Sequence, residues 1–155
     1  MPHIPDKPDP ALWHRYFAID CNNRAWDLTT AARSARDDDE MLNAAHASAF
    51  HWQIAGNELH HMRATMLLAE VHALCGLGRS ALGYATRMRG YFLGRDTPDW
   101  EIAFTHAIHA HAAWVAGERQ VHRASYDEAV KAIAAIADAK EREIVEKTFT
   151  HVPRP

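Results

Sequence analysis

The amino-acid sequence predicts an all-α fold of about seven helices that stack as antiparallel helical hairpins. Most of the glycines and prolines, seven of each in 155 residues, fall between long stretches that contain neither, where they can end and start helices. Few segments alternate between apolar and polar residues with the period of two that a half-buried strand needs. The length is that of one domain, and a hydrophobic fraction of 48% is enough for a sizeable core.

The first half of the chain is expected to form three helices. Residues 9–10, Asp-Pro, are typical of a helix start, and a first helix is predicted over residues 11–35. The acidic residues 37–40 start the second helix, because negative charge is favourable at the positive end of a helix dipole, and Gly56 ends it. A third helix then runs to Gly76.

The second half is expected to form four more helices. The fourth covers residues 79–93, after a tight glycine-containing connection. Residues 97–98, Thr-Pro, provide the N-cap and the first residue of a fifth helix that runs to Gly117. A sixth helix reaches about Ala137, and a short seventh covers residues 139–149 with one apolar face, so that it packs on the outside of the fold.

These helices are expected to form one domain over residues 11–150, between a proline-rich arm at residues 1–10 and a proline-containing tail at residues 151–155. The arm has no apolar run, so it does not read as a signal peptide, and no window reaches the roughly 18 apolar residues of a membrane span.

Cys21 and Cys75 belong to no Cys-x-x-Cys pair and are expected to be reduced packing residues. The predicted location is the cytoplasm.

A short pattern recurs three times near predicted helix ends. An alanine is followed five residues later by an aliphatic residue and two residues after that by a glycine, over residues 49–56, 69–76 and 110–117. The alanine lets a neighbouring helix approach, the aliphatic residue fills the hairpin core, and the glycine ends the helix in the left-handed conformation. The three copies do not follow one fixed period.

Residues 68–85, LAEVHALCGLGRSALGYA, resemble the helix–turn–helix centre of a tetratricopeptide repeat. In that repeat a glycine and an alanine allow the two helices to pack closely, and Gly76 with Ala81 or Ala85 could fill these places. The usual proline between units is missing, and the unit length departs from the roughly 34 residues of the repeat.

Residues 45–52 and 99–104 are similar to segments of a family of small, uncharacterised bacterial proteins with tetratricopeptide-repeat-like helical hairpins. This resemblance runs over most of the chain. It implies a bacterial source and a tetratricopeptide-like right-handed superhelix. It brings no activity and no catalytic residues to this chain.

Twelve histidines are an unusual number for this length, and half of them fall in segments predicted to form the core. Those six are His46, His51, His72, His106, His109 and His111. The histidines expected at the surface of the helices are His14, His60, His61 and His122. Because burial disfavours a charged imidazole, several histidines are expected to be neutral and to make stability depend on pH.

The candidate binding residues lie on the predicted second and fifth helices. His106 and His109 are three residues apart and can point the same way. Opposite His46 and His51, they could line a polar pocket or a transition-metal site, with Trp52 beside them. The alternative is that each histidine is a core residue with one hydrogen bond across a helix interface.

No metal ligand set and no catalytic residue are predicted. Residues 58–61 contain Glu-x-x-His once, whereas a di-iron bundle needs that pair twice with two further glutamates. Cysteine spacing typical of zinc sites is absent from the sequence. Trp13 and Trp100, near predicted helix starts, are the tryptophans best placed to contact a partner.

These features favour a non-enzymatic module of tetratricopeptide-like type that binds a protein or peptide. A net charge of −3 lacks the electrostatic footprint of a nucleic-acid-binding protein, and neither nucleic acid nor a membrane is an expected partner. No cofactor is predicted. The alternative is a small metal- or ligand-binding protein, with or without enzymatic activity, that has a histidine-lined pocket between the second and fifth helices.

Overall fold

The computed structural model describes residues 1–6 and 8–155 and consists of seven α-helices, with no strand in these residues. The all-α prediction is therefore confirmed. In chain order the helices are α1 (Pro10–Thr29), α2 (Ala35–Ala55), α3 (Glu58–Leu74), α4 (Gly78–Leu93), α5 (Asp99–Val115), α6 (Arg119–Ala135) and α7 (Ala139–Phe149).

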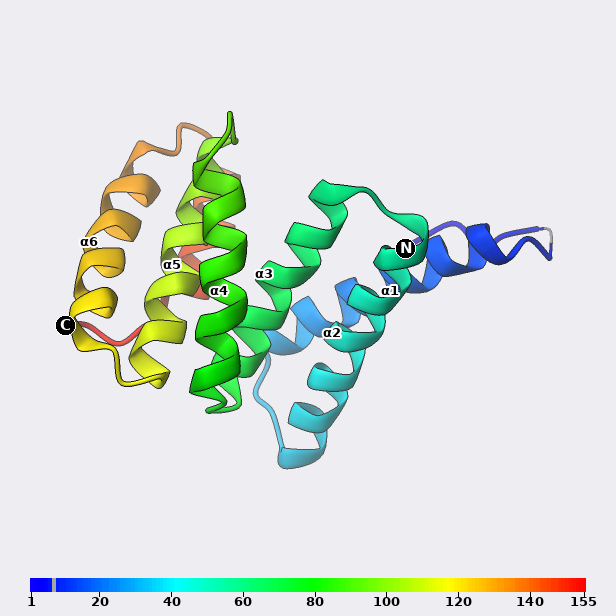
Figure 1. The fold of residues 1–155 in the computed structure, drawn as a ribbon, viewed down its shortest axis with the longest axis horizontal. Helices are drawn as coiled ribbons and strands as arrows, with labels where there is room; N and C mark the ends of the chain where they lie inside the picture. Colours follow the sequence, from blue (N-terminus) through cyan, green and yellow to red (C-terminus); the bar gives the residue numbers. More distant parts are fainter. Residues whose placement is uncertain (7) are drawn as a thin grey trace.

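The helices form three antiparallel hairpins, α1–α2, α3–α4 and α5–α6, followed by the single helix α7. The odd-numbered helices also contact one another in order, α1 with α3, α3 with α5 and α5 with α7, so they form one layer of the stack. In Figure 1 α4 lies in front of this layer, the orange-red α7 lies behind α5, and the amino-terminal arm extends to one side. The layer of odd-numbered helices is the part of the fold that carries the candidate site.

The boundary between α1 and α2 differs from the prediction. The first helix ends at Thr29 rather than at residue 35, because the Arg33 side chain donates to the carbonyl oxygens of Leu28 and Thr29 at 2.9 and 3.0 Å. These bonds satisfy carbonyls that have no partner within the helix. Ser34 then starts α2 as its N-cap in a reciprocal pair with Asp37. The acidic residues 37–40 therefore lie inside the first turns of the helix, and none of them is the N-cap residue, although the Asp37 side chain accepts from the Ser34 N–H.

Two later boundaries also differ slightly. The fifth helix begins at Asp99, and Thr97 is not its N-cap because the Thr97 hydroxyl donates to the Phe92 carbonyl at 2.7 Å. The sixth helix ends at Ala135 rather than near Ala137. The seventh helix has the predicted bounds.

Two of the three recurring patterns end as expected, and the first does not. Gly76 and Gly117 have left-handed backbones, with φ of 74° and 82°. Gly56 has φ of −102°, so the prediction of a left-handed conformation there is wrong. A side chain at Gly56 would lie 2.6 Å from the Trp52 carbonyl oxygen, so glycine is needed there for space. Ile54, expected in the hairpin core, is 52% exposed.

The core lies around α3 and α5, as predicted from their nearly continuous apolar sequences. Residues 64–73 of α3 and 103–113 of α5 are all buried, because each helix has neighbours on several sides. The helix α7 buries Val145 and Thr148 and leaves Ile144 exposed, which agrees with one apolar face on the outside of the stack.

The described part of the chain contains no helix that combines the length and the apolar character of a membrane-spanning segment.

The backbone at Gly76 gives a test of the fold with an internal control. We expect Gly76→Ala to lower the free energy of unfolding by about 1–2 kcal/mol, because an L-residue is strained in the left-handed conformation. Gly83 lies inside α4 with open space around it, so Gly83→Ala should raise stability by about 0.5–1 kcal/mol. Urea unfolding measures both changes. Shifts of the same sign would contradict the helix end described here.

Candidate functional site

The four odd-numbered helices surround a hollow of about 420 Å³, and we call this feature the odd-helix groove. Its lining residues come from α1, α3, α5 and α7 and the turn after α1: Asn22, Trp26, Asp27, Thr29, Thr30, Arg63, Met66, Trp100, Glu101, Phe104, Ile144, Lys147 and Thr148. The groove follows from the single layer that these helices form: α1, α3 and α5 contribute faces that their hairpin partners leave uncovered, and α7 lies beside α5.

Aromatic side chains form the walls of the groove. The Trp26 and Phe104 rings are 5.8 Å apart between centroids, and Trp100 meets Phe104 edge-on at 6.1 Å. Both indoles are half-buried. A second hollow of about 230 Å³ shares Trp100, Phe104 and Ile144 with the first. The two hollows are therefore neighbours with a shared apolar wall, and each is large enough for a side chain of a bound partner.

An ion pair holds the rim of the groove next to these rings. Arg63 of α3 donates from Nε and Nη2 to the two Glu101 oxygens at 2.6 and 3.1 Å, and Glu101 is 2% exposed. The hydrogen bond to Glu101 raises the pKa of Arg63. The guanidinium also lies 5.6 Å from the Trp100 ring. A bidentate pair of this kind fixes orientation as well as charge, so it fixes the position of α3 relative to α5 at the groove.

A second buried carboxylate, that of Glu70, lies on α3 two turns after Arg63. Glu70 is fully buried, and its two oxygens lie 3.2 Å from His111 Nδ1 and 3.3 Å from His151 Nδ1. Burial raises the pKa of Glu70, but the hydrogen bonds from the two imidazoles outweigh it, so the pKa lies below its ordinary value. Residues 151–152 of the tail are thereby packed onto the core, with Val152 only 7% exposed.

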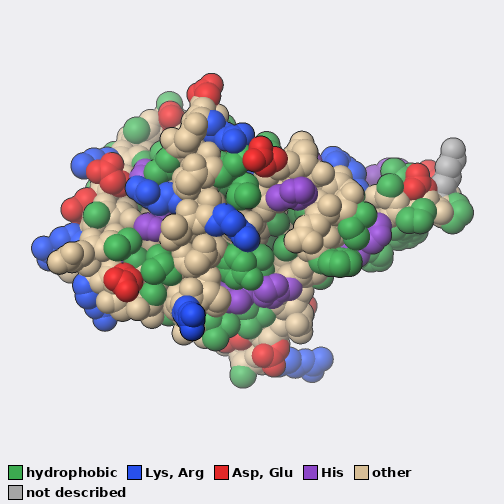
Figure 2. All heavy atoms as spheres, viewed as in Figure 1, with side chains coloured by type: hydrophobic (Ala, Val, Ile, Leu, Met, Phe, Trp, Pro, Cys, Tyr) green, Lys and Arg blue, Asp and Glu red, His purple; other side chains and the backbone are tan. Residues whose placement is uncertain are grey.

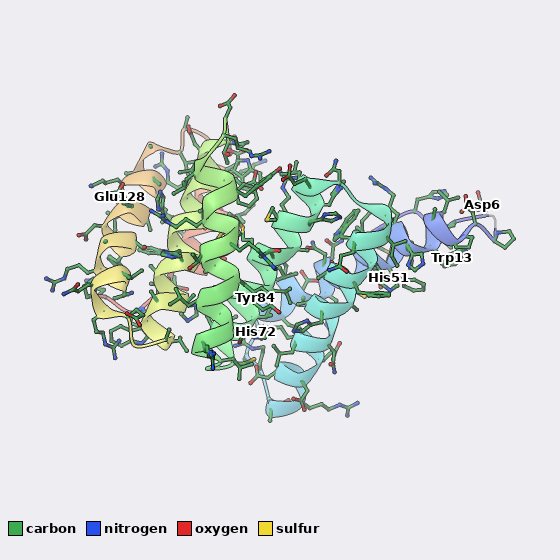
Figure 3. The ribbon with its side chains drawn as sticks, viewed as in Figure 1. Asp6, Trp13, His51, His72, Tyr84 and Glu128 are labelled. Carbon is green, nitrogen blue, oxygen red and sulfur yellow. The ribbon has the colours of Figure 1, made fainter. Side chains whose placement is uncertain are left out.

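The predicted binding residues of α2 have partners on α1 and α3. His46 Nε2 is 2.9 Å from His72 Nε2, and His51 Nδ1 is 2.7 Å from His14 Nδ1. Figure 3 shows His72 between α4 and α2, with His51 farther along toward the amino-terminal arm.

Trp52, the third candidate residue of α2, is 7% exposed and packs in the core with Ala18 and Ala64. Its ring stacks on His60 at 4.1 Å with nearly parallel planes. It therefore packs inside the fold and is not one of the residues that line the groove.

The predicted binding residues of α5 belong to a different environment. His106 and His109 are 8% and 6% exposed, and His109 Nδ1 is 2.7 Å from the Ser125 hydroxyl on α6. Burial, with the nearby Arg89 charge, lowers the pKa of both, that of His109 to about 4. The structure therefore places His106 and His109 in similar buried surroundings near Arg89, and among the described residues neither has a hydrogen bond to His46 or His51.

Two histidines differ from their predicted exposure. His122 is 1% exposed, with its Nδ1 3.0 Å from the Ala110 carbonyl oxygen, and His46 is exposed. The sequence contains signals for both. The buried residues of α6 are His122, Ser125, Ala129 and Ile133, and those of α2 are Met41, Ala45, Ser48 and Trp52. Both sets have helical spacing; His122 belongs to its stripe and His46 falls outside the other.

Within residues 1–6 and 8–155, no three or more histidine, cysteine or acidic side chains are grouped so that they could hold a metal ion. The buried carboxylates instead bond to a guanidinium or to imidazoles.

Most groove residues were outside the predicted candidate set. Trp100 is the exception, since its place near a helix start marks it as a contact residue. Arg63 and Glu101 carry a weaker signal, because a charged residue inside a largely apolar helix needs a partner when it is buried. Their pairing joins positions 38 residues apart, which one sequence does not indicate.

Comparisons with protein-family models, with curated proteins and with solved structures find no match for this chain. Any function is therefore argued from the geometry described above.

The buried histidines predict a loss of stability in acid. The pKa of His109 is about 4 in the folded protein and about 6.5 when unfolded, so the unfolded state binds more protons as pH falls below about 6.5. The His109 contribution is complete above that pH and is lost toward pH 4. By about pH 5 the stability lost through His109 should amount to about 2 kcal/mol, since one pKa unit corresponds to about 1.4 kcal/mol.

Urea unfolding between about pH 7.5 and pH 5 measures this loss. His109→Gln should make stability less dependent on pH, whereas His3→Gln in the exposed arm should not change the dependence. If His109→Gln and the wild type lost the same stability on acidification, His109 would not be a neutral buried group.

Proposed function

We propose that this protein is a non-enzymatic binding module whose odd-helix groove accepts a peptide segment of a partner protein. The observation that carries the proposal is the aromatic wall of the groove, formed by Trp26, Trp100 and Phe104 from two helices of one layer. Stacked helical hairpins offer such surfaces to extended or helical segments. Partly exposed tryptophans are also the residues that most often supply binding energy at interfaces.

The presence of two neighbouring hollows favours a peptide over a compact ligand. The larger hollow alone, at about 420 Å³, falls within the range of small-molecule pockets. The second hollow continues past Trp100 and Phe104 to Ile144 and Glu141. Two neighbouring apolar hollows fit two apolar side chains of one segment, with one side chain in each.

The rim of the groove can recognise the backbone and the polar side chains of such a segment. Asn22 carries both a donor and an acceptor, and Asp27 and Lys147 are exposed at the edge. Arg63 keeps Nη1 free of its bond to Glu101, with 43% of its side chain exposed. The proposed ligand therefore has apolar side chains flanked by polar groups.

The proposed location is the cytoplasm. The two cysteines are free, which suits a reducing compartment.

A phage-displayed library of random peptides, selected on the wild-type protein, tests this function. Selected peptides should share two apolar residues, and Trp100→Ala should weaken their binding at least tenfold, because an aromatic anchor at an interface contributes about 1.4 kcal/mol or more. Trp26→Ala should act in the same direction. Binding is measured by titration of the fluorescent synthetic peptides.

Trp114→Ala is the matched control. Trp114 is also a half-buried tryptophan of α5, but it packs against His122 and under Arg119 rather than in the groove. Peptides that bind Trp100→Ala and Trp26→Ala as tightly as the wild type would show that the groove is not the binding site. Thermal unfolding of each variant confirms that a loss of binding is not a loss of fold.

A further inference from the structure

A pair of imidazoles at the junction of α2, α3 and α4 lies outside the groove. His46 Nε2 and His72 Nε2 are 2.9 Å apart, and His72 Nδ1 is 2.6 Å from the Ser80 hydroxyl. Ser80 Oγ also lies 3.1 Å from the Leu77 carbonyl oxygen. These contacts form one chain from an exposed ring, through a buried one, to the backbone.

The chain of hydrogen bonds fixes which atoms carry protons. A carbonyl oxygen can only accept, so the single hydroxyl proton of Ser80 is donated to Leu77. Ser80 must then accept from His72 Nδ1–H, which leaves Nε2 of neutral His72 without a proton. The lone pair of that nitrogen points at His46 Nε2, so the proton between the two rings belongs to His46.

The hydrogen bond from His72 Nδ1 to Ser80 is of the kind that orients a metal-binding histidine. A ligating imidazole normally donates its other N–H to a nearby acceptor, which fixes its tautomer and orientation, and Ser80 does this for His72. The buried His72 ring is also held edge-on against Tyr84 at 5.2 Å. Figure 3 shows His72 and Tyr84 side by side. The nitrogen is therefore unprotonated and positioned before any ion arrives.

Once the rings turn out of their mutual hydrogen bond so that both lone pairs face one ion, the short distance between the two nitrogens fits some coordination geometries better than others. With metal–nitrogen bonds of about 2.0–2.1 Å, a separation of 2.9 Å corresponds to an angle of about 90° at the metal. Tetrahedral coordination would need about 3.3 Å. An angle of about 90° is that of adjacent ligands in a tetragonal site, which suits Cu²⁺ or Ni²⁺, and Cu²⁺ binds nitrogen sites more tightly.

The site is open to solvent on one side. His46 is exposed, and Figure 2 shows histidine atoms at the surface in the region between α4 and α2. Water can therefore supply the remaining ligands of an ion bound there. Two protein ligands are fewer than the three or more of a closed site, so the ion is expected to exchange with solvent.

We propose that His46 and His72 form a surface site for a divalent transition-metal ion, with Cu²⁺ as the best-matched ion, that joins α2 to α3. The ion binds the lone pair of His72 Nε2 and takes the place of the proton on His46 Nε2, while His46 Nδ1 takes up a proton from solvent. Both rings therefore stay neutral imidazoles, and binding releases no net proton. This site is distinct from the odd-helix groove and does not depend on the function proposed for it.

Titration of the untagged full chain with Cu²⁺ tests the site. The wild type should bind one equivalent that His46→Gln and His72→Gln do not bind, with an electron paramagnetic resonance spectrum of tetragonal Cu²⁺ coupled to two nitrogens. Thermal unfolding should show a Cu²⁺-induced rise of the melting temperature in the wild type that is lost in both variants.

His51→Gln is the matched control. His51 lies on the same helix and also pairs with a histidine, but its contact with His14 is through Nδ1, and among the described residues neither ring has a hydrogen-bond partner for its Nε2. His51→Gln should keep the equivalent of Cu²⁺ that is lost in the other variants. His46 is exposed, so His46→Gln remains folded and keeps the test decisive if His72→Gln does not fold.

Two outcomes would overturn the proposal. One is that His46→Gln binds as many equivalents of Cu²⁺ as the wild type, with the same spectrum. The other is that His51→Gln loses the same equivalent as His46→Gln, which would place the ion elsewhere on the protein.

Discussion

Enclosure of the central helix α3 is the constraint on which most of this structure depends. It contacts α1, α2, α4 and α5, and residues 64–73 have almost no contact with water. A polar side chain on such a helix must find a partner within the protein, because an unpaired buried group is costly. Glu70 and His72 meet this requirement through His111, His151, Ser80 and His46. Much of the unusual histidine content therefore lies around helices that are closed to solvent.

The odd-helix groove lies on the side of the central helices that their hairpin partners leave uncovered. Hairpin partners cover α3 and α5 on one side, while the odd-numbered helices meet one another on the other side. On that side the Arg63–Glu101 pair connects α3 to α5 at the rim, and the hollow is open to solvent where Trp26 and Trp100 line it. The aromatic rings are thus only half-buried because no eighth helix covers them in the described chain, and this leaves apolar surface for a partner segment.

The sequence predicts the helices well and their contacts poorly. The unbroken apolar stretches of α3 and α5 identify the centre of the fold, because a helix that is apolar on all sides is buried. The end of α1 is predicted too late because Arg33, beyond the helix, donates hydrogen bonds to the last carbonyl groups of α1. The next residue, Ser34, is already the N-cap of α2. The groove is missed for a similar reason: Trp26, Arg63 and Trp100 become neighbours only when separate hairpins stack.

The contact between Glu70 and His151 joins positions 81 residues apart, in a fold whose other helix pairs are mostly neighbours in the chain. During synthesis the hairpins can form in order as they leave the ribosome, since their contacts are local. The carboxylate of Glu70 receives its second imidazole only after residue 151 has been synthesised. The final packing of the central helix is therefore later than the formation of the three hairpins, because it needs a residue that follows all of them in the chain.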